Sequence, residues 1–93
     1  MARPRRRFRV TGDTLYRDLL GEGILLQTET ARYFGVDGVA RRMWQLIVEH
    51  GDLDRVEAEL KREYQVSPEM LAADLDRFVA QLLKKKLVES LPD

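Results

Sequence analysis

Few residues in this 93-residue chain could support catalysis. Cysteine is absent and histidine occurs once, at His50, which excludes thiolate chemistry, disulfides and cysteine or multi-histidine metal sites. Serine occurs only at Ser67, where we expect a helix cap, and at Ser90 near the C-terminus, and neither has a candidate base beside it. No glycine-rich loop follows a strand and opens a helix, as a phosphate-binding loop would. We therefore expect no catalytic residue, no metal and no cofactor.

Charge is neutral in total but unevenly spread. Lys plus Arg and Asp plus Glu each number 16, yet five arginines fall within residues 1–9. Such a segment could bind nucleic acid or an acidic surface, or it could be a flexible, solvated terminus. The longest apolar runs are far shorter than the roughly 18 residues that span a membrane, and no apolar run typical of a secretory signal follows the arginines. We expect a cytoplasmic protein that does not contact a membrane.

The first third of the chain has the pattern of β-strands. Residues 15–19 alternate apolar and polar side chains, and residues 24–28 and 33–36 are short runs rich in β-forming residues. The connections between them are short, which predicts an antiparallel meander with 33–36 at its edge. Phe8 and Val10 could add a short strand before it.

The remainder has the pattern of three helices. Asp37 and Asp52 are candidate N-caps for the first two, and Gly51 is expected to end the first. Ser67 followed by Pro68 predicts the start of a third helix, running to about residue 86. The sequence thus predicts an α+β fold, with a three-stranded antiparallel sheet followed by three helices, similar to a winged helix-turn-helix. We expect a basic, partly flexible tail over 1–13, one domain over 14–88 and a C-terminal tail over 89–93.

Two binding functions are compatible with that fold. A recognition helix for DNA normally offers basic or amide side chains in its first turns, whereas the third helix carries Glu69, Asp74 and Asp76 there. This argues against nucleic acid, although the arginine-rich N-terminus could still follow a backbone without specificity. The uncharged run 33–36 at a sheet edge favours an extended peptide that adds a strand, or a second copy of the chain. We expect a monomer or a weak homodimer.

The chain resembles the PqqD family over about residues 14–88. The resemblance rests on the stretch 15–36 with its Gly-Glu, Thr-x-x-Tyr-Phe pattern, on 37–47 with its Gly and Trp, and on 63–69 with the residues Asp74, Phe78, Leu82 and Leu87. Three departures stand out: Val36-Asp37 replaces the usual Leu-Asn, and Ala31 and Lys86 replace glycines. Asp37 can still cap a helix, whereas Lys86 would have to accept or avoid the left-handed conformation.

The resemblance implies a non-catalytic module that binds the leader of a ribosomally synthesised and post-translationally modified peptide (RiPP) precursor and presents it to a modifying enzyme. A module of this size without a fused enzyme is similar to the lasso peptide type, whose partners would be a separate leader-cleaving cysteine protease and a macrolactam synthetase. The alternative within the same mechanism is a PqqD-type chaperone that delivers a precursor to a radical SAM enzyme.

The resemblance also implies where the leader binds: as an added strand on the third strand, against the third helix. Backbone pairing would come from Tyr33, Phe34, Gly35 and Val36. One broad helix face would contribute Asp74, Arg77, Phe78, Gln81, Leu82 and Lys85. We expect Phe78 and Leu82 to form an apolar floor, or to belong to the core. The charges at 74, 77 and 85 would set the register of the peptide, or be solvated surface.

Overall fold

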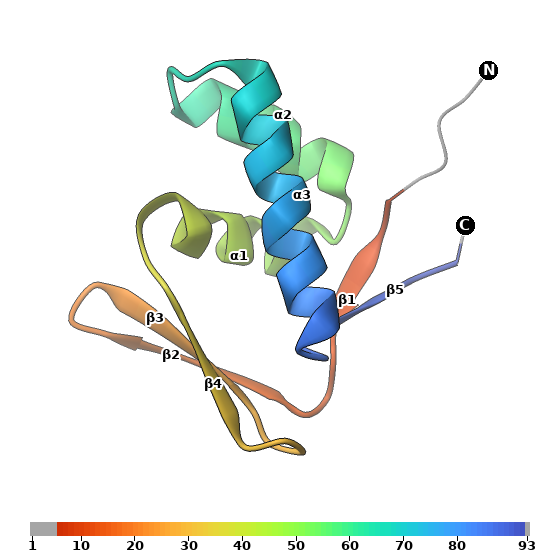
Figure 1. The fold of residues 1–93 in the computed structure, drawn as a ribbon. Helices are drawn as coiled ribbons and strands as arrows, with labels where there is room; N and C mark the ends of the chain where they lie inside the picture. Colours follow the sequence, from red (N-terminus) through yellow and green to blue (C-terminus); the bar gives the residue numbers. More distant parts are fainter. Residues whose placement is uncertain (1–5, 93) are drawn as a thin grey trace.

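The computed structural model describes residues 6–92, so residues 1–5 of the expected tail and Asp93 lie outside the described residues. The expected α+β architecture is confirmed (Figure 1). Its elements in chain order are β1 (Phe8–Val10), β2 (Thr14–Leu19), β3 (Glu22–Gln27), β4 (Arg32–Val36), α1 (Gly38–His50), α2 (Leu53–Glu63), α3 (Pro68–Lys84) and β5 (Val88–Ser90).

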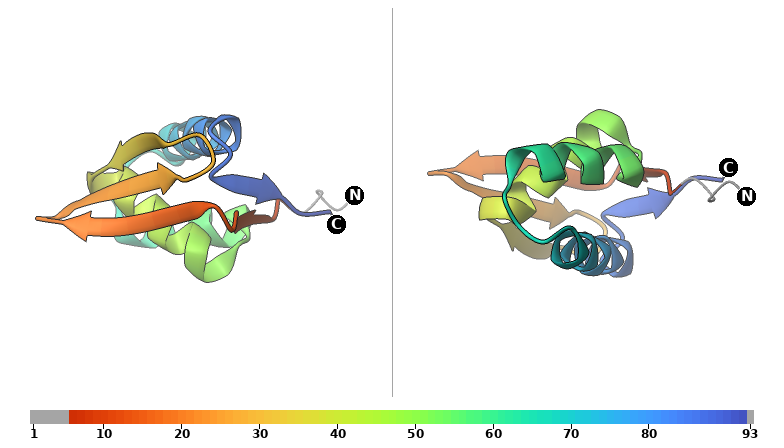
Figure 2. Two further views of the ribbon diagram at one scale, coloured as in Figure 1. Left: turned by 90° about the horizontal axis from the view of Figure 1, so that it is seen from below. Right: turned by 90° about the horizontal axis from the view of Figure 1, so that it is seen from above.

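The main sheet is an antiparallel meander with strand order β2-β3-β4, so β4 is one of its edges. Leu20 and Gly21 join β2 to β3, and both have positive φ, as in the type I′ turns that match strand twist. Gly23, Leu25 and Gln27 alternate along β3 and are buried, whereas their neighbours are partly exposed. The three helices therefore cover one face of this sheet (Figure 2).

The three helices begin where their sequence signals indicate, whereas α3 ends at Lys84, slightly before the expected end near residue 86. The Asp52 side chain accepts a hydrogen bond from Asp54 N, and the Ser67 side chain accepts one from Met70 N with Pro68 in the first turn of α3. Gly51 ends α1 in the left-handed conformation. Asp37 occupies the N-cap position of α1 in an extended conformation but makes no side-chain cap hydrogen bond.

The core lies between the sheet and the helices. Leu25, Leu60 and Leu75 are fully buried, and Met43 and Trp44 are buried beside them. Tyr16 stacks on Trp44, with ring centroids 6.0 Å apart, and this contact joins β2 to α1. Burial of each large aliphatic side chain contributes roughly 1.5–3 kcal/mol, so this cluster is the main source of stability.

The two ends of the chain form a second, two-stranded sheet. β1 pairs antiparallel with β5, in the register Phe8↔Ser90 and Val10↔Val88. A short strand at residues 8–10 was an open expectation, but β5 was not expected, since residues 89–93 were assigned to a tail. Arg6 adds ion pairs to Asp54 on α2 and Asp76 on α3. Residues 6–13 and 88–92 therefore pack on the domain.

Candidate functional site

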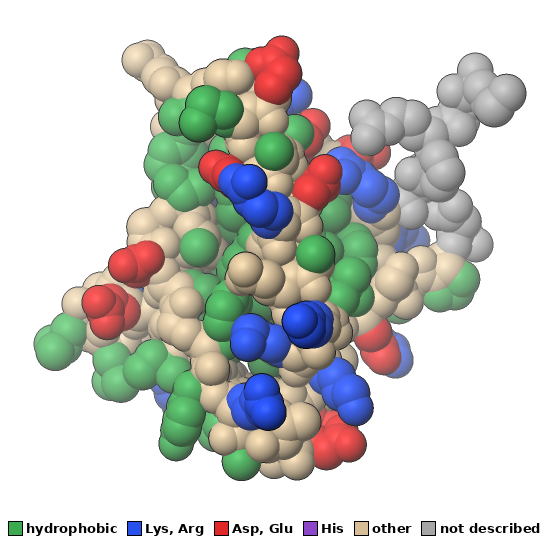
Figure 3. All heavy atoms as spheres, viewed as in Figure 1, with side chains coloured by type: hydrophobic (Ala, Val, Ile, Leu, Met, Phe, Trp, Pro, Cys, Tyr) green, Lys and Arg blue, Asp and Glu red, His purple; other side chains and the backbone are tan. Residues whose placement is uncertain are grey.

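A groove of about 630 Å³ runs between β4 and the C-terminal half of α3. It lies at the edge of the main sheet, because β4 is paired with β3 along one side only in the part of the chain that the structure describes. Basic side chains gather over the same end of α3 in the space-filling view (Figure 3). The groove is lined by Thr30, Arg32, Phe34, Gln81, Lys84, Lys85 and Lys86.

The Phe34 ring forms the floor of the groove, and the Phe78 ring stacks beneath it. The Phe34 ring lies on the Phe78 ring, with centroids 6.2 Å apart and planes 24° from parallel. Phe34 is half-buried and lines the groove, whereas Phe78 is only 7% exposed and Leu82 is fully buried. An apolar side chain entering the groove would therefore meet Phe34 first, with Phe78 and Leu82 supporting it from the core.

A cation lies over this floor. The Lys85 ammonium lies 5.3 Å from the Phe34 ring centroid, within the range of a cation–π interaction. The contact holds the Lys85 head group at the mouth of the groove. The groove therefore offers an apolar surface and a positive charge next to each other.

The edge strand presents its residues in alternating directions. Phe34 and Val36 point towards the helices, and Val36 is buried. Tyr33 is 75% exposed and points away from them, and a Cβ placed on Gly35 would contact nothing within 4 Å. Among the described residues no strand other than β3 pairs with β4, so the outer edge of its backbone can pair with another extended chain.

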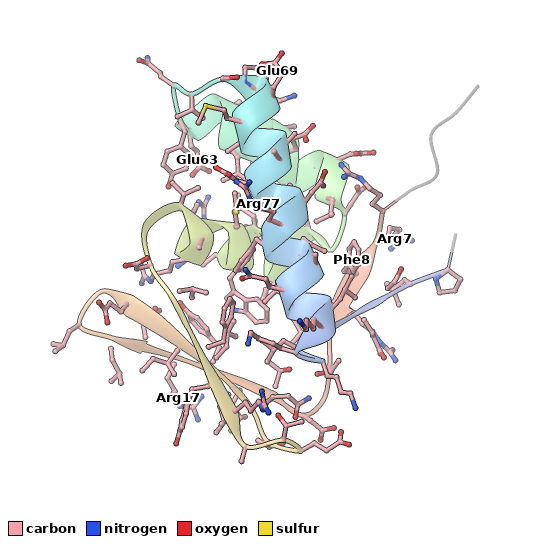
Figure 4. All side chains as sticks on the ribbon, viewed as in Figure 1. Arg7, Phe8, Arg17, Glu63, Glu69 and Arg77 are labelled. Carbon is pink, nitrogen blue, oxygen red and sulfur yellow. The ribbon has the colours of Figure 1, made fainter. Side chains whose placement is uncertain are left out.

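The ten residues expected at the site are only partly brought together. Phe34, Gln81 and Lys85 line the groove; Tyr33, Gly35 and Val36 belong to the edge strand; and Phe78 and Leu82 lie beneath the floor. Arg77 lies further up α3 (Figure 4) and forms an ion pair with Asp74, and neither residue lines the groove. Whether a peptide contacts these ten residues stays a prediction.

Sequence reasoning missed four residues that line the groove: Thr30, Arg32, Lys84 and Lys86. The three consecutive lysines 84–86 are a visible signal, but lysines at the end of a helix also suit the negative end of its dipole, so the run alone does not indicate a binding site. Arg32 precedes the apolar run of the edge strand, and only the placement of β4 against α3 brings it beside the lysines.

A separate polar cluster attaches the β2–β3 hairpin to α1. Tyr16 Oη donates to Asp18 Oδ1 at 2.6 Å, and Arg41 Nε donates to the same oxygen at 2.9 Å. The Arg41 hydrogen bond lowers the pKa of Asp18, while burial raises the pKa of Tyr16. A Cβ on Gly23 would lie 2.5 Å from Tyr16 Oη, so glycine is needed there. The hydrogen bonds of this cluster attach β2 to α1.

Residues 6–92 contain no group of three or more acidic or histidine side chains placed to hold a metal ion. Within the same range, no helix combines the length and apolar character that crossing a bilayer requires.

Comparison with protein-family models shows which family this chain belongs to. Residues 22–88 match the model of the family described as Coenzyme PQQ synthesis protein D (PqqD). The chain belongs to the PqqD family. No curated protein matches it.

Two solved structures are similar to this one over nearly their whole length. The structure of TbiB1 in complex with the TbiA(beta) leader peptide has a TM-score of 0.83 and 28% sequence identity, and the match covers 91% of this chain and 99% of that one. Lasso peptide synthetase B1 complexed with the leader peptide has a TM-score of 0.80 at 18% identity, covering 89% and 98%. The second likeness shows the PqqD fold alone, and the first adds a sequence relationship.

Proposed function

We propose that this protein is a non-catalytic recognition module that binds the leader peptide of a RiPP precursor by strand addition. The observation that carries the proposal is the unpaired edge of β4 beside a groove with an aromatic floor. It is supported by membership of the PqqD family and by the likeness to TbiB1, which is bound to a leader peptide.

In the proposed complex the leader pairs with the backbone of Tyr33–Val36 and directs alternate side chains into the groove. An apolar leader residue lies on Phe34, which Phe78 and Leu82 support, while Gln81 and Lys85 flank it. Asp74 and Arg77 contact the part of the leader that continues along α3. Since the edge of β4 cannot pair with a peptide and a second copy at once, leader binding competes with any weak homodimer that forms through β4.

In the proposed mechanism, the protein presents the precursor peptide to a partner enzyme. Leader binding raises the local concentration of the attached core peptide near the active site of a partner enzyme. We propose a lasso peptide pathway in the cytoplasm, with a separate leader-cleaving cysteine protease and a macrolactam synthetase as partners. This choice over a radical SAM partner rests on the resemblance of the chain to the lasso peptide type, and the fold that it shares with lasso peptide synthetase B1 supports it.

Strand addition can be tested with backbone-modified peptides. The probe is a fluorescein-labelled leader of the precursor encoded beside this protein, with the TbiA(beta) leader as a second probe. Two versions of each carry N-methyl groups on either the odd or the even amides of the segment that binds. Only alternate amides of an added strand face β4, so one version should lose binding and the other should keep it. Fluorescence anisotropy gives both dissociation constants.

The unmodified leader and a scrambled leader are the positive and negative controls. Equal binding by both N-methylated versions would contradict strand addition while leaving side-chain docking possible. Failure of every leader to bind more tightly than its scrambled version would contradict leader recognition itself.

A further inference from the structure

The basic side chains of this protein fall into two groups. Among residues 6–92, most arginines and lysines form an ion pair with a carboxylate: Arg6, Arg9, Arg41, Arg42, Arg55, Lys61, Arg62 and Arg77. In the same range the others have no carboxylate oxygen within 4 Å: Arg7, Arg17, Arg32, Lys84, Lys85 and Lys86. Four of these six line the groove, so the unneutralised charge is concentrated at one place.

We call Arg32, Lys84, Lys85 and Lys86 the basic end of the groove. Four like charges around one hollow repel one another, and an anionic group bound among them would relieve that repulsion. Elsewhere on α3 the balance is different, because Asp74 neutralises Arg77 through their ion pair. The lining of the groove itself contains no carboxylate, although Lys86 also borders a second hollow with Asp13, Glu29 and Glu89.

We infer that the basic end binds an acidic side chain of the leader, placed two residues from the apolar side chain that lies on Phe34. This inference rests on the proposed function and specifies its substrate class. Arg32 and Phe34 are two residues apart on β4 and both line the groove. Two residues of a strand span roughly 6.6 Å, and a paired strand keeps the same spacing, so the recognised pattern is apolar-x-acidic or its reverse.

The surroundings favour an acidic peptide over nucleic acid as the occupant. The four cations lie beside an unpaired strand edge and the Phe34 ring, which suit an extended peptide. The first turns of α3, which a helix-turn-helix protein would place in a DNA groove, present Glu69 and Asp74. Nucleic acid is therefore the alternative that the experiment must separate.

The test is a charge exchange between protein and peptide. In the leader, each Asp or Glu is replaced singly by Lys. In the protein, Arg32→Glu is compared with Arg17→Glu, a matched control on β2 of the same sheet, which is also exposed and has no carboxylate within 4 Å among the described residues (Figure 4). Arg32→Glu should weaken binding of the natural leader about tenfold, and Arg17→Glu less than about twofold.

Rescue identifies the contact. One Lys-substituted leader should carry its change two positions from the apolar residue. Wild-type protein should bind this leader about tenfold more weakly than it binds the natural leader. The Arg32→Glu variant should bind it more tightly than it binds the natural leader. The side on which that position falls reports the direction of the added strand. Thermal melts show whether the two protein variants are equally folded.

The outcomes distinguish a failure of this inference from a failure of the proposed leader-binding function. Tight leader binding that is unaffected by any acidic-to-Lys change, with equal effects of Arg32→Glu and Arg17→Glu, overturns the inference and leaves leader recognition standing. Absence of binding by wild type overturns the proposed function. Displacement of the leader by a random DNA duplex at physiological salt, abolished by Arg32→Glu but not by Arg17→Glu, assigns the basic end to nucleic acid instead.

Discussion

Two residues in the loops beside the groove adopt the left-handed backbone conformation although neither is glycine. Ala31, just before β4, has φ 57°, and Lys86, just after α3, has φ 61°. A side chain with a Cβ is strained there by roughly 1–2 kcal/mol. These are the two positions where the PqqD resemblance expects glycine, so the fold keeps the conformation although the residue has changed.

Replacing Ala31 by glycine should therefore stabilise the protein. We expect Ala31→Gly to raise the free energy of unfolding by about 1 kcal/mol, because glycine adopts positive φ without strain. This corresponds to an increase of about 4–8 °C in Tm for a domain of this size. The matched control is Ala73→Gly, in the exposed middle of α3, which should lower stability by about 1 kcal/mol. The same sign for both changes would contradict the strain at residue 31.

At the scale of elements, α1 and α2 are joined by one well-formed ion pair. Arg42 donates two hydrogen bonds to Glu63, at 2.7 and 2.8 Å. This bonding lowers the pKa of Glu63 below its usual value of 4.5. A lowered folded-state pKa contributes stability that is present above the unfolded pKa and is lost as the pH falls through the folded value.

Glu63→Gln should accordingly cost stability at pH 7, and the cost should shrink as the pH falls below 4.5. Both side chains are about one-third exposed, so we expect no more than about 1 kcal/mol in urea unfolding. Glu57→Gln is the control, because Glu57 pairs only with Lys61 within α2, at 3.4 Å, and its loss should be smaller. A cost for Glu63→Gln that is unchanged at pH 3 would show that packing, and not ionisation, is responsible.

Elements also show how far sequence alone can predict this protein. Three strands and three helices follow from apolar periodicity and from caps such as Ser67 and Gly51, which are local signals. β5 was missed because three residues carry no periodicity and its partner β1 is some 80 residues away. The groove was predicted only in part, because some of its residues also come together through contacts between distant parts of the chain. The sequence identifies Phe34 and Lys85, whereas Arg32 joins the site only through the packing of β4 against α3.

At the scale of the whole molecule, the groove is separate from the small sheet that β1 and β5 form. Val88 is buried where β5 meets the core, and it does not line the groove between β4 and α3. Phe34, by contrast, lines the groove and is only partly buried against the core. Stability and binding should therefore respond to different substitutions.

We expect Val88→Ala to lower the free energy of unfolding by about 2 kcal/mol while leader affinity stays within about twofold of wild type. Phe34→Ala should weaken leader binding about tenfold or more, since it removes the surface on which the apolar leader residue lies. Its stability loss should be smaller than the roughly 3–5 kcal/mol expected for Phe78→Ala, which opens a cavity in the core. Urea unfolding and anisotropy titrations on the same samples measure both quantities. Parallel losses of stability and affinity in all three variants would mean that binding depends on the whole fold, and that the groove is not a distinct site.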